Sequence, residues 1–430
     1  MAMRLPEEIL IEIISLVALS GTKFHQPVQR DDLNHRQILS MMLVCQRWHT
    51  LAEPFLYRRL RFGHVWPYDP ERDWDFLRFL EYQPHLANYV REVDVHNRAI
   101  EIDGLVLDIL SCCKRTQRLN YFGRLSNTPS AVLEAIKSLP LKKLYLGSLT
   151  FNLLMDHNFL FLLELRSLEE LHMQDWSSEY GTIVPVNLRY PSPTEFDNLP
   201  TKYIRSSNIK TLHLGRPNSF PSLTTYLVFC PIHLEEISLE GLDCAGGPEQ
   251  TFLSPDEIEQ LLGLHRDSLK RIRVLTLGSI SSNFKDLLPS FIAFPRIEQL
   301  WLCATQVFRR ETPCDLYRKI SAPKLSLLIL EFSEEVCYYG GGDAFNGAEI
   351  QWIQEFATIH SQTHLAPKLR EIFIIFRPIL ENTQDFSWPW DRLNKVAEFC
   401  SPRGIKLTYS EPIDRAEWDL KVAEELKYRG

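Results

Sequence analysis

Two segments of this chain contain residue types that could perform chemistry, a glycine-rich run and a serine-rich turn. The run Gly340-Gly341-Gly342-Asp343 lacks the last glycine and the strand-to-helix setting of a dinucleotide-binding fingerprint. The turn that begins at Gly278 ends in Ser282, where a nucleophile elbow requires glycine. No G-x-x-x-x-G-K-[ST] phosphate loop occurs. We therefore expect no catalytic residues here, and we interpret the glycine run as a loop tip.

Cysteine and histidine spacing predicts no metal site and no cofactor. The nine cysteines stand at positions 45, 112, 113, 230, 244, 303, 314, 337 and 400. No C-x-x-C pair and no H-E-x-x-H motif occurs. The odd number and wide gaps favour free thiols in a reducing compartment, and no N-x-[ST] sequon occurs, so we expect a cytoplasmic or nuclear protein. The sequence predicts a non-enzyme, although a triad assembled in space across distant segments stays open as an alternative.

A six-residue template, L-x-x-L-x-L, recurs along most of the chain. Clear copies begin at Leu168, Ile209, Leu234, Ile297, Leu325 and Leu369, with weaker copies at 90–95, 141–146 and 269–274, and degenerate ones near Leu119 and Ile405. Six of the ten intervals between copies are 25 to 28 residues, which lies inside the leucine-rich-repeat period. Intervening stretches predict helices at Ala131–Leu139, Pro255–Leu264 and Phe284–Phe294. The longer intervals predict surface loops at 176–200, 241–255 and 336–365.

Strand periodicity sorts the residues of each template copy into two faces. Because alternate strand residues point to opposite sides, the template leucines are predicted to lie in the core and the others on a concave sheet surface. One position then lines up from strand to strand, and its residues are Asp94, Asn120, Tyr145, His172, His213, Ser238, Arg273, Trp301, Ile329 and Phe373. We call this line of residues the concave row. It begins polar and ends aromatic and apolar.

The late part of the concave row is the predicted binding surface for a protein substrate. Exposed Trp, Arg and apolar side chains on successive strands are typical binding anchors, so we assign this role to Arg273, Trp301, Ile329 and Phe373. Two alternatives stay open. The C-terminal segment covers the patch through Trp418, Leu420 and Val422, or Arg271 and Arg273 recognise a phosphorylated or acidic segment.

Three short helices are predicted in the first sixty residues. Pro6 suits a first helical position, and Glu7 and Glu8 complement the helix dipole behind it. The apolar face that follows, over 9–17, is too broad for one neighbouring helix. Further helical patterns run from about Asp32 to Val44 and on to Leu56. So small a module buries little apolar surface by itself, which predicts that another protein covers it.

The two ends of this module resemble an F-box. L-P-x-E-I-L-x-x-I begins at Leu5, and L-V-C-x-x-W begins at Leu43. The resemblance covers residues 5 to about 60 and implies docking onto a Skp-type adaptor, which joins a cullin and a RING subunit into a ubiquitin ligase. The adaptor contacts that it implies are Leu5, Pro6, Ile9, Leu10, Ile13, Val44, Cys45 and Trp48. The alternative is that some of these, Trp48 and the neighbouring Ile14 above all, only pack the helices together. The stretch 21–32 is longer than usual and is expected to loop out.

The repeats resemble the irregular leucine-rich repeats that follow F-boxes, as in the large fungal set of such proteins. They depart from the regular pattern because the Asn or Cys after each strand is mostly missing. We therefore expect an α/β fold with an F-box at 1–61, a leucine-rich-repeat-like strand–helix solenoid at 62–410 and a helical tail at 411–430. The resemblance implies a substrate-recognition adaptor of an SCF-type (Skp–cullin–F-box) ubiquitin ligase. The alternative is a leucine-rich-repeat interaction scaffold without ubiquitin transfer.

Composition and charge agree with these expectations. The 430 residues carry a formal net charge of −8 with a pI near 5.9, which opposes binding to a nucleic-acid backbone. The apolar run from Ile9 to Leu19 contains Glu12 and follows two further glutamates, so it does not fit a signal peptide. No run of 18 apolar residues occurs, so no membrane span is expected.

Overall fold

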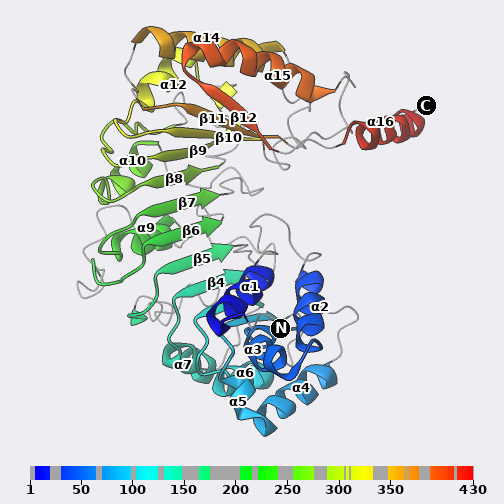
Figure 1. Ribbon diagram of the computed structural model, residues 1–430. Helices are drawn as coiled ribbons and strands as arrows, with labels where there is room; N and C mark the ends of the chain where they lie inside the picture. Colours follow the sequence, from blue (N-terminus) through cyan, green and yellow to red (C-terminus); the bar gives the residue numbers. More distant parts are fainter. Residues whose placement is uncertain are drawn as a thin grey trace. The chain divides into compact units, whose positions relative to one another are not determined.

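The computed structural model describes most of the chain in two compact units, Met1–Thr182 and Ile183–Gly430 (Figure 1). The described residues are 5–19, 31–63, 70–97, 103–123, 130–147, 164–174, 204–215, 221–240, 255–275, 288–304, 307–308, 311–332, 347–363, 366, 368–376, 388–410 and 414–429. The predicted loops at 176–200 and 241–254, the link at 21–30 and the glycine run at 340–343 lie outside them. Within these ranges, no helix is long and apolar enough to cross a membrane.

The first unit opens with three helices, α1 (Glu7–Leu19), α2 (Asp31–Met42) and α3 (Gln46–Leu56). Each of them packs on the other two. Their common core contains Ile14, Ile38 and Ala52, one residue from each helix, and Trp48 packs against it. The predicted three-helix module is therefore present, and its small core agrees with the expectation that much apolar surface stays outside.

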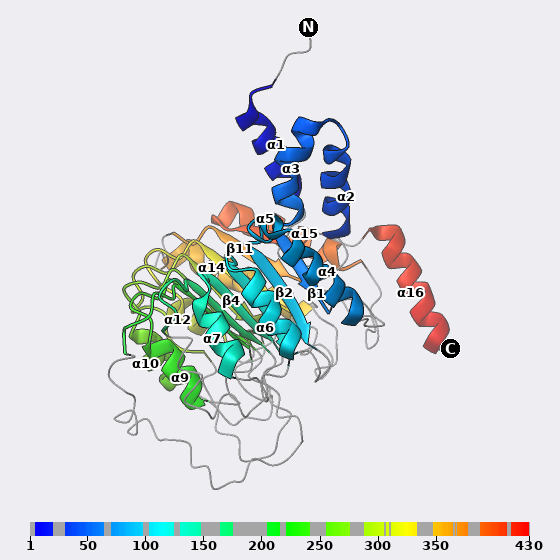
Figure 2. The same cartoon turned by 90° about the horizontal axis from the view of Figure 1, so that it is seen from below.

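Five parallel strands follow in chain order in the first unit. They are β1 (Arg59–Phe62), β2 (Glu92–Asn97), β3 (Arg118–Gly123), β4 (Lys143–Gly147) and β5 (Glu170–Gln174). The helices between them are α4 (Pro70–Tyr82), α5 (Pro84–Ala87), α6 (Asp103–Cys112) and α7 (Ser130–Ser138). Helix α6 packs between α4 and α7 along one face of the strands (Figure 2). The first strand begins within the stretch predicted as F-box, because β1 follows α3 directly.

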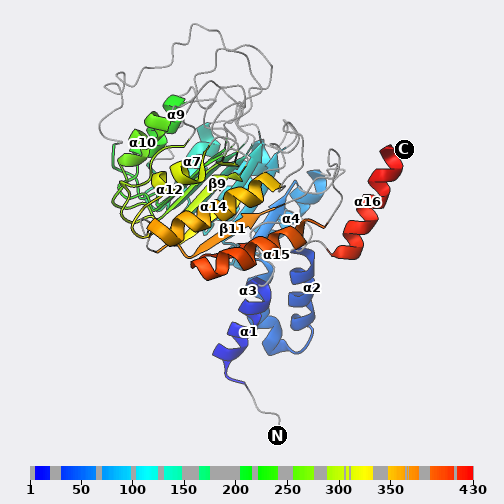
Figure 3. The same ribbon diagram turned by 90° about the horizontal axis from the view of Figure 1, so that it is seen from above.

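Seven parallel strands form the sheet of the second unit. They are β6 (Thr211–Gly215), β7 (Glu236–Glu240), β8 (Arg271–Val274), β9 (Gln299–Cys303), β10 (Leu327–Glu331), β11 (Glu371–Ile375) and β12 (Lys406–Tyr409). The helices are α9 (Pro221–Phe229), α10 (Pro255–Gly263), α12 (Pro313–Lys319), α14 (Gly347–Thr363), α15 (Pro389–Cys400) and α16 (Arg415–Arg429), with a short 3-10 turn, η7 (Ser401–Arg403), after α15. Figure 3 shows α14 beside α12 and α15. The predicted alternation of strand and helix is confirmed.

The template leucines hold the strands in register. Leu144 pairs with Leu171 in the first unit, and Leu300 pairs with Leu328 in the second, and all four are fully buried. A second contact recurs between neighbouring strands. The backbone carbonyl just before one strand accepts hydrogen bonds from two successive N–H groups at the start of the next strand. The oxygen of Arg58, for example, accepts the N–H groups of Arg91 at 2.9 Å and Glu92 at 3.0 Å. The leucine pairs and these backbone hydrogen bonds keep neighbouring parallel strands aligned, and neither requires a side-chain hydrogen bond.

Three details of the predicted pattern are wrong. The predicted loop at 336–365 contains the 17-residue helix α14, whose buried side chains include Trp352 and Phe356 at helical spacing. The described end of the predicted helix Phe284–Phe294 consists of turns instead. The last strand lies two residues later than predicted, because Leu407 rather than Ile405 pairs with Ile372.

Candidate functional site

Helix α1 has two apolar stripes with different environments. Leu10 and Ile14 lie one helical turn apart and are buried at 3% and 0% exposure. Ile9 and Leu16 lie on a second stripe with Leu5, and all three of these side chains are exposed. A helix that packs only on its own module needs one stripe, so the second one is available to another molecule.

The end of α2 extends this exposed apolar surface. Leu39 and Leu43 lie one turn apart, and Leu43 is 86% exposed, with Val44 beside it at 63%. We define the module surface by six exposed apolar side chains, Leu5, Ile9, Leu16, Leu39, Leu43 and Val44, and Ile11 of α1 is exposed as well. Several of them leave large apolar areas in water, which is typical of a surface that a protein partner covers.

The predicted adaptor contacts differ in their solvent exposure. Exposed positions are Leu5, Pro6, Ile9, Val44 and Cys45, and Ile13 is half-buried. Leu10 lies inside the module, and Trp48 packs on the core that contains Ile14, as the helix-packing alternative expected. As adaptor contacts, sequence reasoning missed Leu16, Leu39 and Leu43, although the i, i+3 spacing of Ile13 and Leu16 and the i, i+4 spacing of Leu39 and Leu43 were usable signals.

Strand pairing places the late concave row in line. Arg273 pairs with Trp301, Trp301 with Ile329, and Ile329 with Phe373. The row continues to Thr408 on β12. The four predicted substrate contacts therefore occupy adjacent positions on β8, β9, β10 and β11.

Arg273 is held over Trp301 by two carboxylates. Its guanidinium carbon lies 3.9 Å from the centre of the Trp301 ring. Its Nη1 donates to Glu240 at 2.5 Å, and its Nη2 donates to Glu331 at 3.0 Å. This arrangement combines a cation–π contact with two charge-assisted hydrogen bonds. One face of Trp301 is thus covered by Arg273 rather than open to a partner.

The C-terminal helix α16 does not cover the concave row through the three residues that the first alternative named. Trp418 is buried, but its ring packs edge-on against Trp388 and Trp390 at 6.0 and 5.9 Å. Leu420, which the alternative placed over the last strands, is 61% exposed. The alternative is therefore wrong for Leu420, and Trp418 is the buried one of the three residues that it named.

The second alternative, recognition of a phosphorylated segment by Arg271 and Arg273, conflicts with their ion pairs. Arg271 Nε donates to Glu236 at 2.8 Å, and Arg273 is held by Glu240 and Glu331. A guanidinium already bound to carboxylates gains little from a second anion and must first lose its present hydrogen bonds. These two side chains are therefore poor receptors for a phosphate.

The first unit carries a ladder of rings on the same sheet face. Successive ring centres lie 4.3 Å apart from His96 to Phe122, 5.1 Å from Phe122 to Tyr145, and 5.5 Å from Tyr145 to His172. Gly147 makes room for it, because a Cβ atom there would lie 2.4 Å from the Phe122 ring. All four rings are half-buried, so they stay partly accessible.

Glu170 at the end of this ladder yields a pH prediction. Burial favours its neutral form, but hydrogen bonds from His172 and Lys143 outweigh burial and lower its pKa to about 2. Because the folded pKa lies below the unfolded value, this carboxylate stabilises the fold above about pH 4.5, and the contribution disappears as pH falls towards 2. Glu170→Gln is expected to cost about 1–2 kcal/mol at pH 7 and nothing near pH 2. Urea unfolding at both pH values measures this difference, and an equal cost at both would contradict it.

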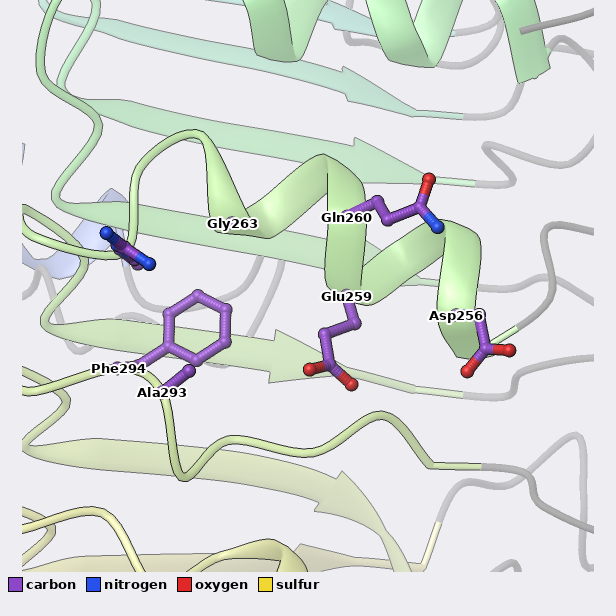
Figure 4. A pocket seen from close by; sticks show the side chains of 7 residues that line it. Asp256, Glu259, Gln260, Gly263, Ala293 and Phe294 are labelled. Atoms are coloured by element: carbon purple, nitrogen blue, oxygen red, sulfur yellow. The ribbon is translucent and has the colours of Figure 1, made fainter.

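A pocket of about 400 Å³ opens beside α10 in the second unit (Figure 4). It is lined by Asp256, Glu259, Gln260, Gly263, Arg266, Ala293 and Phe294. Figure 4 shows the carboxylates of Asp256 and Glu259 on the helix and the Phe294 ring across from it. Glu259 also accepts the Ser290 N–H at 3.2 Å, so one carboxylate already serves the fold. The lining groups do not converge on one point, and we assign no ligand to this pocket.

Metal chemistry finds no support in the described part of the chain, and two of its buried thiols are unreactive. No group of three or more His, Cys, Asp or Glu side chains is placed to hold a metal ion there. The described cysteines are free thiols. Burial raises the pKa of Cys230 to about 12 and that of Cys400 to about 11, which makes both poor nucleophiles.

Comparison with known families identifies the three-helix module. The F-box-like family model matches residues 2–63, which contain α1, α2, α3 and β1. No curated protein matches the chain. The matched range includes every residue of the module surface. The chain therefore carries an F-box-like domain at residues 2–63, and this domain suggests the general role of a substrate-recognition adaptor.

Proposed function

We propose that this protein is the substrate-recognition subunit of an SCF-type ubiquitin ligase. Its F-box-like domain docks onto a Skp-type adaptor, and its leucine-rich-repeat-like region, 62–410, binds a protein substrate. The observation that carries the proposal is the module surface, which lies within the matched residues 2–63. The protein supplies no catalytic group in this scheme. It raises the effective concentration of the substrate near a ubiquitin-loaded enzyme.

The energetics of the module surface favour a protein partner. Burying one Leu or Ile side chain is worth about 1.5–3 kcal/mol, so a partner that covers several of them gains a substantial docking energy. Leu43 at 86% exposure and Leu16 at 64% offer the most area to bury. Leu10 and Trp48 support docking indirectly, because they fix the helices that present these side chains.

Co-purification with a Skp-type adaptor tests the docking proposal. Ile9→Asp with Leu43→Asp places two charges in the module surface, and we expect adaptor binding to fall by at least a hundredfold, at about 1.5 kcal/mol or more for each site. Both side chains are exposed, so the melting temperature should change little. Leu420→Asp, at a similarly exposed leucine in α16, is the matched control and should bind normally. Undiminished adaptor binding by the double variant would overturn the proposal.

For the substrate, we propose the surface around Trp301, Ile329 and Phe373. Ile329 is only 9% exposed, so Phe373 and the open part of Trp301 supply most of the contact area. Glu240 and Glu331 flank the patch and hold Arg273 in place. A partner with an apolar anchor fits this arrangement.

Crosslinking of partners in cells with the proteasome blocked tests this surface. Phe373→Glu should deplete specific partners at least tenfold, whereas Tyr428→Glu, at an exposed position of α16, should leave the partner set unchanged. Identical partner sets for both variants would rule out this surface. Ubiquitination of a depleted partner by the reconstituted ligase distinguishes the adaptor from the alternative interaction scaffold, which would bind the partner without modifying it.

A further inference from the structure

Three arginines meet at one edge of the first unit, where the strands begin. Arg58 and Arg91 occupy equivalent positions directly before β1 and β2, and the carbonyl of Arg58 accepts the N–H of Arg91 at 2.9 Å. Gln117 holds the same position before β3, and its N–H donates to the carbonyl of Arg91 at 2.7 Å. Arg115 stands two residues ahead of Gln117, in the turn that leads into β3. The fold therefore places three arginines at the beginning of successive strands, near enough for the charges of Arg58 and Arg115 to act on Arg91.

These arginines lack the carboxylate partners that neighbouring cations have. Arg59 and Arg61, on β1, both bind Asp94, at 2.7 and 3.3 Å. Within the described ranges, no ion pair joins Arg58, Arg91 or Arg115 to an acidic side chain. The Nε of Arg58 is buried and has no hydrogen-bond partner in that part of the chain. A buried donor without an acceptor costs about 1–3 kcal/mol, so the fold leaves this guanidinium incompletely satisfied.

Arg91 is fixed in position inside this cluster. Its Nη1 donates to the backbone carbonyls of Asn88 at 2.7 Å and Val90 at 2.9 Å. Burial and then the like charges of Arg115 and Arg58 lower the pKa of Arg91. The side chain is thus held where two other cations repel it, in a chain with a net charge of −8. Such a site is preorganised for an anion, because binding relieves the repulsion without rearranging the backbone.

We propose that Arg58, Arg91 and Arg115 bind a phosphate group at this edge of the first unit. Planar guanidinium groups donate two parallel hydrogen bonds to phosphate oxygens, and three of them match one compact dianion. An extended polyanion fits less well, because it would run from this small cluster onto a negatively charged protein. The phosphate is either free or carried by a phosphorylated side chain of a partner, and this inference does not depend on adaptor docking.

Calorimetric titration of the full-length protein tests the site. The probes are inorganic phosphate, a phosphoserine peptide and the same peptide without phosphate, each at constant ionic strength. Arg115→Gln is the main variant, because this side chain is exposed. We expect it to weaken phosphate binding at least tenfold and to raise the melting temperature slightly in chloride buffer, since it removes repulsion. Arg266→Gln, at an exposed arginine of the second unit, is the matched control and should bind normally.

The results distinguish a free phosphate from a phosphorylated partner, and some of them would overturn the proposal. Binding of the phosphopeptide at least tenfold tighter than inorganic phosphate assigns a phosphorylated partner, whereas equal affinities assign the free anion. Phosphate binding that Arg115→Gln and Arg91→Lys leave unchanged would overturn the site, as would no phosphate binding at all. A short DNA duplex that binds more tightly than both phosphate probes, with a steep salt dependence, would replace the compact anion by a nucleic-acid backbone.

Discussion

Asp94→Asn is expected to lower the free energy of unfolding of the first unit by about 3–5 kcal/mol. Asp94 is 2% exposed and binds Arg59 through Nε at 2.8 Å and Nη2 at 2.7 Å, with Arg61 Nε at 3.3 Å. Asparagine keeps the shape of the side chain but removes its charge. Two guanidinium groups on β1 then lose the buried carboxylate that binds both of them. The loss exceeds that of one hydrogen bond, because this carboxylate accepts from Arg59, Arg61 and the Asn120 amide.

Urea unfolding followed by circular dichroism measures this loss. Asp75→Asn is the matched control, because Asp75 pairs with Arg78 at 3.4 Å while both side chains are largely exposed. Exposed pairs contribute about 0–1 kcal/mol, so this variant should unfold almost as the unmodified protein does. Equal losses in the two variants would show that Asp94 acts as an ordinary surface charge and would contradict the role assigned to it.

Trp390→Ala is expected to destabilise the second unit by about 3–5 kcal/mol and to release α16. Trp390 is 2% exposed, and its ring lies 4.4 Å from that of Trp388 and 5.9 Å from those of Phe376 and Trp418. Removing it leaves a large cavity at the point where the helix is attached. Trp418 then loses one of its two aromatic neighbours and becomes accessible.

Thermal melting and limited proteolysis check the two parts of this prediction. Cleavage before Arg415 should become at least tenfold faster in Trp390→Ala. Trp390→Phe is the control, because it keeps most of the ring volume and removes an indole N–H that is buried without a partner in the described structure. We expect that variant to lose about 1 kcal/mol or less. A helix that stays protected in Trp390→Ala would show that other contacts anchor it.

The sequence predicted the repeating part of this fold well because its signal is local. Leucines at fixed spacing mark each strand, and the buried pairs such as Leu144 with Leu171 follow from that spacing. Helix α14 was missed because its interval was longer than the common period, although its buried Trp352 and Phe356 lie at helical spacing. The unusually long interval between β10 and β11 was interpreted as a loop, but it contains a helix.

The candidate surfaces were only partly predictable, because burial and charge pairing depend on distant residues. The motif at the first helix indicated Leu5 and Ile9 as contacts, but it could not separate them from Leu10, which the other helices bury. Arg273 and Trp301 were predicted to share a row. Their stacking depends on Glu240 and Glu331, which come from two other strands. No spacing rule within one strand reveals such a contact.

The paired amides at the start of most described strands have a consequence for how this chain can evolve. The carbonyl of Glu235, like that of Arg58, accepts two successive amides of the next repeat, at 2.8 and 3.1 Å. Every residue except proline provides these groups, so the link between neighbours sets no requirement on side-chain identity. Repeats can therefore be duplicated, lost or diverge in sequence while the joint between them survives. Selection is then free to alter the concave face, and with it the choice of partner, one repeat at a time.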